Sequence, residues 1–176
     1  MMKFLFKTII SILLFFYFLL LFFPKEGFYN LVEKELSKNK IFVSNEIRKE
    51  KLFGLKVDDM YIYFDGLDSA NISSMDFTTF LFLTTLEIKD VRVSKSFEDI
   101  LPSKVETLTL KHTVISFDTI DIKANGDFGE FSGQIRLLDK KIIGFLEPSS
   151  LMQSKYRKIL QKFKLKDGKY EYELNF

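Results

Sequence analysis

Hydrophobic and polar residues follow three patterns along the chain, and the first is a continuous apolar run. Residues 1–27 read MMKFLFKTIISILLFFYFLLLFFPKEG, and between Thr8 and Phe23 only Thr8 and Ser11 are plainly polar. With Phe4–Phe6 included, the run reaches 20 residues, which is about the length that crosses the hydrocarbon core of a bilayer. The pattern predicts a transmembrane segment.

The residues that flank this run predict its orientation. Lys3 and Lys7 lie on its N-terminal side, and positive residues favour the cytoplasmic side of a membrane. A cleaved signal peptide is the alternative, but it requires small residues at the cleavage site, whereas this run ends FLLLFFPKEG. We therefore predict an uncleaved signal anchor over residues 1–24, with the remainder of the chain outside the cytoplasm.

Two later segments have the period of a helix. In residues 28–36, FYNLVEKEL, the apolar side chains gather on one face, which predicts a juxtamembrane helix within residues 25–40. Residues 148–163 begin with a proline, which suits the first turn of a helix. The apolar stripe of this second helix is predicted to consist of Met152, Tyr156, Ile159, Leu160 and Phe163. The opposite face is basic, and it either touches anionic lipid headgroups or is simply solvated, which is the commoner case.

The third pattern, from Ile41 onward, is an alternation with a period of two, which is typical of β-strands. The predicted strands cover residues 55–65, 71–83, 84–93, 104–112, 114–123, 127–138 and 141–146, with a hairpin turn at Asn125-Gly126 and a helical turn at residues 96–101. Each strand has one apolar face and one polar face, as expected for an antiparallel sheet with one wet side. No long linker interrupts the set, so residues 41–176 are predicted to form one β-rich domain.

The apolar faces of these strands supply the candidate site. A one-sided sheet must be covered by helices, by a second layer or by a ligand. The candidate lining residues are Phe80, Phe82, Leu86, Leu108, Leu110, Ile120, Ile122, Phe131 and Ile135. They form either an ordinary closed core, which is the plainer interpretation, or an open groove that holds an acyl chain.

The last residues, YEYELNF, place Tyr170, Tyr172, Leu174 and Phe176 on one face of a strand. This has the form of an outer-membrane barrel signal. The preceding helix, however, interrupts the hairpin repeat that barrels need, and the N-terminal anchor would keep the chain in the inner membrane. We therefore interpret the segment as the closing strand of the domain, with its aromatic face covering the apolar side of the sheet.

Composition and charge exclude several classes of function. Net charge is +2, and because Lys3 and Lys7 supply both charges, residues 24–176 balance at 24 basic against 24 acidic residues, a poor match for nucleic acid. There are no cysteines, and His112 is the only histidine, which excludes thiolate chemistry and two-histidine metal sites. The Asp residues cluster without the spacing of a calcium loop, and no phosphate-binding motif is present. We predict that the chain is not an enzyme and needs no cofactor.

The C-terminal third, from about Lys123 to Phe176, carries a family resemblance. The segment GDFGEFSGQIRL is followed by a short hydrophobic strand, GFLEPSSLM, a helix with a tyrosine and a closing strand. This order resembles the type II secretion system protein N family and, more loosely, the AsmA-like periplasmic proteins. The resemblance implies a bitopic inner-membrane protein whose periplasmic sheet is curved, with an apolar concave side. It brings no catalytic residues.

Together these observations predict a mainly β fold with two short helices, in which a curved, mostly antiparallel sheet lies behind an N-terminal transmembrane helix. The predicted location is the bacterial inner membrane, with a single span and the C-terminal domain in the periplasm. Two functions remain open. The first is a non-enzymatic envelope protein that acts as an interaction or accessory component of a secretion or envelope assembly system, with other envelope proteins as partners. The second is a lipid-binding module with an apolar groove.

Overall fold

The computed structural model describes residues 2–22, 24–166 and 168–176, without the side chains of residues 2, 19–21 and 28. Phe23, the last residue of the predicted apolar run, lies outside the described residues. The elements in chain order are α1 (Met2–Leu21), α2 (Lys25–Lys38), β1 (Ile41–Ser44), β2 (Ile47–Lys51), β3 (Gly54–Phe64), β4 (Leu67–Phe80), β5 (Leu83–Val93), β6 (Lys104–Thr113), β7 (Thr119–Gly126), β8 (Gly129–Arg136), β9 (Lys141–Pro148), α3 (Ser150–Ser154), α4 (Arg157–Leu160), β10 (Lys164–Lys166) and β11 (Lys169–Asn175).

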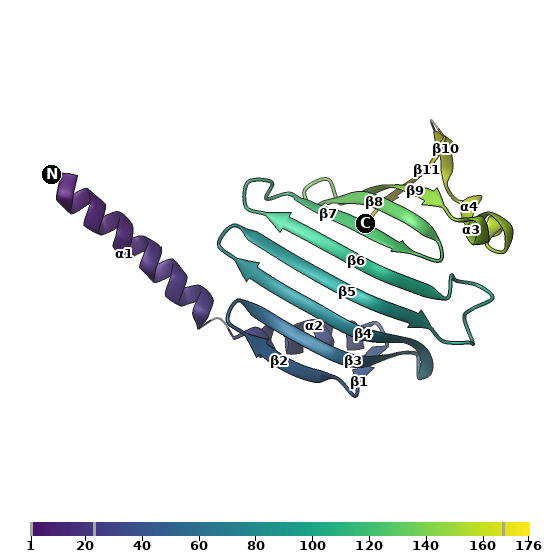
Figure 1. Cartoon of the computed structure of the whole chain (residues 1–176), viewed down its shortest axis with the longest axis horizontal. Helices are drawn as coiled ribbons and strands as arrows, with labels where there is room; N and C mark the ends of the chain where they lie inside the picture. Colours follow the sequence, from purple (N-terminus) through teal and green to yellow (C-terminus); the bar gives the residue numbers. More distant parts are fainter. Residues whose placement is uncertain (1, 23, 167) are drawn as a thin grey trace.

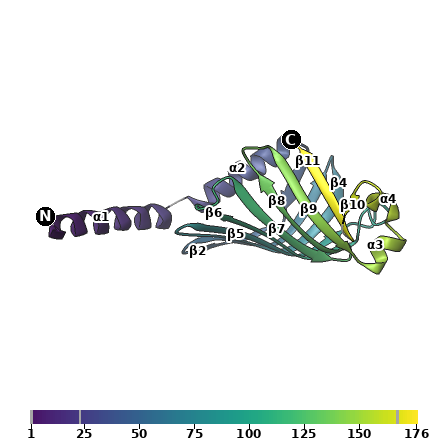
Figure 2. The same ribbon diagram turned by 90° about the horizontal axis from the view of Figure 1, so that it is seen from above.

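All of the strands belong to one open sheet, shown face-on in Figure 1. The order is β1-β3-β4-β5-β6-β7-β8-β9-β11-β10, with β2 also paired to β3, and every pairing is antiparallel. The prediction of a mainly β fold is therefore confirmed. Figure 2 shows that the sheet is curved and bends toward the side on which α2 lies.

Helix α1 extends away from the sheet (Figure 1). Its described apolar side chains face outward, and Phe4, for example, is 76% exposed. Within the described residues, no helix combines the length and the apolar character that a membrane crossing requires, and the predicted transmembrane helix is not confirmed.

Helix α2 packs on the N-terminal end of the sheet. Tyr29 on α2 is buried against Leu55, Val57 and Met60 on β3. Arg48 on β2 also packs against this contact, since its guanidinium lies 4.4 Å from the centre of the Tyr29 ring. The same guanidinium donates to Glu33 on α2 at 3.1 Å, to Glu46 at 2.7 Å and to Asn30 at 2.6 Å.

A row of residues that interrupts the regular cross-strand pairs runs across the sheet, and we call it the bulge row. It consists of Asp59, Ser73, Asp90 and Glu106 on β3, β4, β5 and β6, which lie opposite one another between regular pairs. Asp59 and Asp90 have φ of 58° and 50°. The row ends at β7, where the register of β6 against β7 shifts between Val105 and Thr107. Bulges of this kind bend and twist strands, so consecutive insertions fold the sheet along one line.

The C-terminal helical region differs from the prediction of a single helix over residues 148–163. Pro148 is the last residue of β9, and Ser149 begins α3 by accepting a hydrogen bond from the N–H of Met152 at 3.1 Å. The helix then breaks at Tyr156, whose φ and ψ of −107° and 25° are not helical. The tyrosine hydroxyl donates to the Glu98 carbonyl at 2.7 Å, so a contact with the sheet accompanies the break.

Candidate apolar ligand site

One face of the sheet is apolar from end to end, and we call it the apolar face. Cross-strand partners share a face, so the registers identify its members. The central row runs Val57, Met75, Ile88, Leu108, Ala124, Phe131, Leu146 and Tyr170. The neighbouring row runs Leu55, Phe77, Leu86, Leu110, Ile122, Gly133, Gly144 and Tyr172.

Helices cover only the two ends of the apolar face. The buried hydrophobic residues of the described chain form two separate clusters, one under α2 and one under α3 and α4. The second contains Leu146, Met152, Tyr156 and Leu160. Between the clusters, the apolar side chains of β4 to β7 are only half-buried. The middle of the apolar face is therefore open, where a closed core would show side chains as buried as Val57, which is 0% exposed.

A hollow of about 350 Å³, which we call the apolar pocket, lies on this face beside α3 and α4. Its volume falls in the range of small-molecule sites. The lining residues are Val93, Leu101, Pro102, Val105, Ala124, Phe128, Phe131, Leu146, Met152, Ile159 and Phe163, and all of these side chains are apolar. Such a lining favours a hydrocarbon and supplies no side chain for acid–base or nucleophilic chemistry.

Three hydrogen bonds hold the walls of the apolar pocket. The Tyr156 hydroxyl reaches the Glu98 carbonyl in the connection between β5 and β6. The Ser103 hydroxyl, at the end of that connection, donates to Asp127 at 2.6 Å. The Ser149 hydroxyl donates to the Asp127 carbonyl and caps α3. The connection, the turn between β7 and β8, and the two short helices are therefore tied together around the pocket.

A pair of glycines lets one aromatic ring lie flat on the floor of the apolar pocket. Gly133 on β8 and Gly144 on β9 are cross-strand partners. A Cβ built on Gly144 would lie 2.2 Å from the Phe131 ring, and one on Gly133 would lie 3.2 Å from it. The ring therefore occupies the space that a side chain at position 144 would fill. At position 133 a Cβ would lie 2.6 Å from the Ile143 carbonyl oxygen, so the second glycine of GEFSGQ permits the close approach of β9.

The predicted site residues are brought together only in part. Leu86, Leu108, Leu110, Ile120, Ile122, Phe131 and Ile135 all lie on the apolar face. Phe80 has the opposite orientation to Phe77, and Phe82 lies in the turn after β4, so both are at one end of the strands. In the predicted helix stripe, Met152, Ile159 and Phe163 line the pocket, and Tyr156 and Leu160 are buried beneath it.

Sequence reasoning missed much of the pocket lining. Val93 and Val105 lie on the apolar face only because the bulge row reverses the alternation of β5 and β6. Leu101, Pro102 and Phe128 belong to turns and connections, where alternation gives no signal. The bulge itself could have been suspected from Asp90, a charged residue at a position of β5 where alternation with Leu86 and Ile88 expects an apolar side chain.

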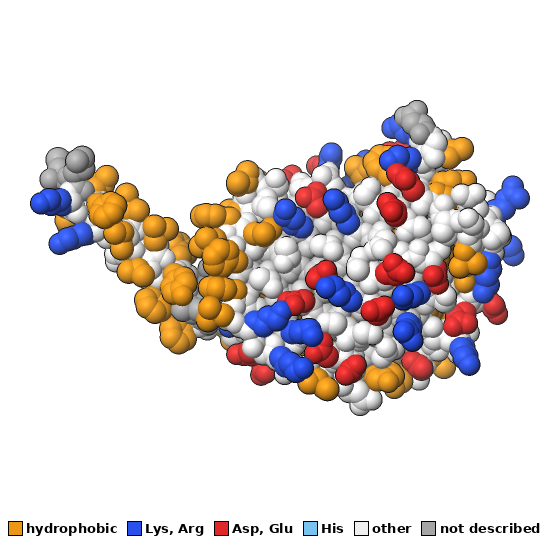
Figure 3. Space-filling model, viewed as in Figure 1, with side chains coloured by type: hydrophobic (Ala, Val, Ile, Leu, Met, Phe, Trp, Pro, Cys, Tyr) orange, Lys and Arg blue, Asp and Glu red, His pale blue; other side chains and the backbone are white. Residues whose placement is uncertain are grey.

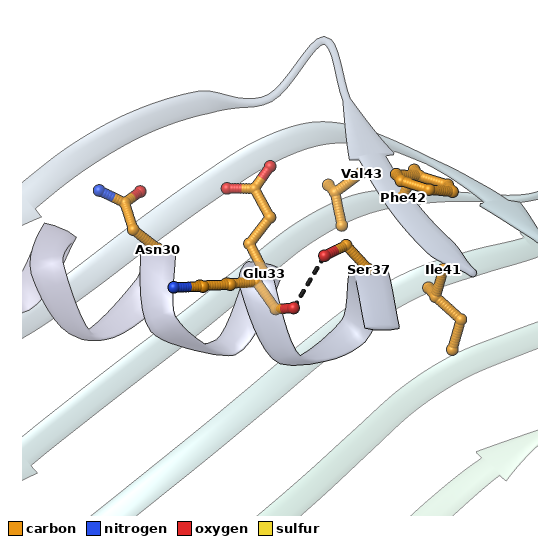
Figure 4. A pocket seen from close by; sticks show the side chains of 7 residues that line it. Asn30, Glu33, Ser37, Ile41, Phe42 and Val43 are labelled. Carbon is orange, nitrogen blue, oxygen red and sulfur yellow. Dashed lines mark hydrogen bonds between the residues drawn. The ribbon is translucent and has the colours of Figure 1, made fainter. Parts of the chain in front are cut away.

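Two of the other hollows have polar as well as apolar residues in their lining. One, of about 360 Å³, lies between α2 and β1, where Figure 4 shows Asn30, Glu33 and Ser37 facing Ile41 to Val43. The Ser37 hydroxyl there donates to the Lys34 carbonyl at 2.8 Å, and Glu33 is paired with Arg48. The other, of about 740 Å³, lies on the outer face over β6 to β9. Because the first hollow uses its polar groups internally, we do not take it as the site.

The electrostatic features of the domain lie outside the apolar pocket. Burial, assisted by the charge of Glu46, raises the pKa of Tyr29 to about 12. Burial raises the pKa of Glu46, but the hydrogen bond to Arg48, a hydrogen bond to its own backbone and the charge of Arg48 together outweigh this and leave the pKa lowered. These groups stabilise the contact of α2 with the sheet. Among the described residues, no group of His, Asp and Glu side chains has the arrangement of a metal site.

No family model, curated protein or solved structure matches this chain. The resemblance of the segment from Lys123 to Phe176 to type II secretion system protein N therefore stays a prediction.

Proposed function

We propose that the chain is a membrane-attached, non-enzymatic lipid-binding module that holds an acyl chain along its apolar face, with one end of the chain in the apolar pocket. The observation that carries the proposal is the open middle of the apolar face, where the side chains of β4 to β7 stay half-buried between two helix-covered ends. Soluble monomers rarely expose a large continuous apolar surface unless it binds something.

The shape and chemistry of the site support a hydrocarbon ligand. The curved sheet is concave on the apolar side (Figure 2), and the pocket at one end is lined by apolar side chains alone. A lipid headgroup would find no polar partner there, because burying an unpaired polar group costs about 1–3 kcal/mol. The site is therefore suited to the acyl chain, with the headgroup in solvent.

Membrane attachment is proposed for α1. From Ile12 to Phe18 its residues are apolar on every side apart from the Tyr17 hydroxyl, and such helical segments are normally buried in protein or in lipid. Here, the described apolar side chains of α1 are exposed instead, so a bilayer is the environment that would cover them. Lys3 and Lys7 favour a cytoplasmic N-terminus, which would place the sheet on the far side, in the periplasm of a bacterium with two membranes.

The edges of the sheet give less support to the accessory role predicted from the sequence. The edge strands are β1, β2 and β10, which read IFVS, IRKEK and KLK, so lysines occur on β2 and β10. Lysines on an edge oppose the addition of a further strand. Strand addition would therefore be limited to β1, and recovery of a fixed set of envelope proteins after crosslinking in membranes would be needed to favour the accessory role.

Photocrosslinking tests the lipid-binding proposal. The full chain, reconstituted in bilayers that contain a phospholipid with a diazirine on its acyl chain, is irradiated and digested, and the crosslinked peptides are mapped by mass spectrometry. We expect crosslinks on β5 to β9 as well as on α1. Leu108→Asp on the apolar face should abolish the sheet crosslinks, whereas its neighbour Thr109→Asp, on the outer face, should not. Crosslinks confined to α1 would overturn the proposal.

A further inference from the structure

The strand ends nearest α1 form a second apolar surface, which we call the apolar rim. It consists of the turns Leu52-Phe53, Leu81-Phe82, residues 114–118 and residues 137–140, together with the terminal Phe176. Backbone hydrogen bonds join successive members, from Thr79 to Phe53, Val114 to Phe82, Leu137 to Asp118 and Phe176 to Lys140, at 2.7–2.9 Å. The rim is therefore one continuous edge.

The side chains of the apolar rim point into solvent. Ile115 is 91% exposed and Leu138 is 72% exposed. The other large hydrophobic residues exposed on the rim are Leu52, Leu81, Phe82, Val114, Phe117, Leu137 and Phe176. Figure 3 shows hydrophobic side chains along the edge of the domain beside α1, whereas Lys, Arg, Asp and Glu cover the face in view.

Two turns of the apolar rim, Leu52-Phe53 and Leu81-Phe82, lack the residues that two-residue hairpin turns normally use. Two-residue turns favour Asn-Gly or Asp-Gly, because these residues tolerate a positive φ. The turn after β4 is instead Leu81-Phe82, and Leu81 has φ of 50°. A side chain in the left-handed region costs about 1–2 kcal/mol. At the opposite ends of the strands, the turns after β3 and β7 begin with Asp65 and Asp127.

Aromatic contacts connect the apolar rim to α1. The Tyr17 ring on α1 and the Phe53 ring are 6.3 Å apart at their centres, and the Phe53 ring is 4.9 Å from that of Phe80. Tyr17 precedes Leu21, the last residue of α1, by four residues, which is about 6 Å along a helix axis. The rim thus lies alongside the final turns of α1 and not beyond them.

We propose that the apolar rim is a membrane-docking surface that enters the interfacial layer of the bilayer holding α1. This inference rests on the proposed insertion of α1. If the end of α1 marks the bilayer surface, Phe53 lies about 6 Å below it, a depth typical of interfacial segments. The turn residues of the rim carry two acids, Asp118 and Asp139, and one base, Lys140, so docking depends on apolar burial and not on anionic lipid.

Docking by the rim would bring the apolar face to the lipid. The row of that face nearest the rim includes Thr84, His112, Ile120, Ile135 and Ile142, whose strands end in the rim turns. An acyl chain leaving the bilayer between the rim turns would therefore meet the apolar face without crossing a charged surface.

Site-specific labelling tests this surface, because the chain has no cysteine of its own. A fluorophore is attached to Ile115→Cys in the full chain, which is reconstituted in phosphatidylcholine vesicles containing a lipid with a shallow, chain-attached quencher. The matched control is Ile100→Cys, which is also exposed, at 63%, but lies between β5 and β6 at the opposite ends of the strands. We expect several-fold stronger quenching at position 115, unchanged by salt or by added anionic lipid.

Equal quenching at the two positions, or quenching at neither, would overturn the rim proposal. A second measurement tests whether the apolar character of the rim is needed. With the fluorophore on Phe82→Cys, the additional substitution Leu138→Asp should reduce the quenching. The outcome is separable from that of the proposed function. Quenching at position 115 with no acyl-chain crosslinks on the sheet would retain the rim and refute the lipid site, and the reverse result would do the opposite.

Discussion

Replacing Ala124 with Phe separates an open apolar face from a closed core, because the two give opposite results. Ala124 lies between Leu108 and Phe131 in the central row and lines the 350 Å³ apolar pocket. In a closed core, the added ring would overpack the interior and lower the free energy of unfolding by about 1–3 kcal/mol. On an open face the ring fills part of the pocket, so stability should stay the same or rise by about 1 kcal/mol.

The same ring should weaken lipid binding. If it displaces about three methylenes of an acyl chain, at ~0.8 kcal/mol each, the loss is about 2.4 kcal/mol, or roughly 50-fold in Kd. Kd is measured by displacement of a fluorescent fatty acid from the full chain in bilayer discs, and stability by urea unfolding followed through tyrosine fluorescence. Lys123→Phe is the matched control, since it adds the same ring to the outer face. A variant that is destabilised yet binds lipid normally would refute the open face.

Three further changes test the supports of the site. The pKa of Tyr29 is raised from 10.0 to about 12, so its contribution to stability is complete below pH 10 and is lost as pH rises through 12. The variant Tyr29→Phe should therefore show a smaller decline in the free energy of unfolding over this alkaline range. Tyr156→Phe removes the hydrogen bond to Glu98 and should lower the free energy of unfolding by about 1 kcal/mol. Amide hydrogen exchange in the connection between β5 and β6 should become faster. Unchanged exchange would show that this hydrogen bond does not hold the connection. Asp90→Val forces a branched side chain to φ of 50° and should cost about 1–2 kcal/mol more than Asp90→Gly in thermal unfolding.

Alternation of apolar and polar residues was sufficient to predict a one-sided antiparallel sheet, because strand faces are set by local side-chain period. It failed where one residue is inserted. Ile88 and Val91 lie on the same face although three positions separate them, since Asp90 adds a residue to β5. If the period of two is continued past Asp90, Val93 is assigned to the outer face, and this lining residue of the apolar pocket is missed. A curved antiparallel sheet was predicted, but the position of the bulge row was not.

Turn signals misplaced one hairpin for a related reason. Asn125-Gly126 has the composition of a turn, yet both residues belong to β7, and the chain reverses at Asp127-Phe128. Gly126 is needed in the strand, because a Cβ there would lie 2.4 Å from the Lys104 carbonyl oxygen. Asn125 is held by Glu106 at 3.1 Å. Tertiary contacts, which the local sequence does not reveal, therefore decide the role of both residues.

The strand order has a consequence for how the domain forms as it is made. From β3 to β9, every strand pairs with the strand that precedes it in the chain, so each new hairpin can add to an edge already in place. Local pairing of this kind lowers the entropic cost of folding and speeds it. A chain that emerges N-terminus first could extend the sheet strand by strand. The free edge of β9 would be covered last, when β11 pairs with it and the lysine-bearing β10 pairs with β11.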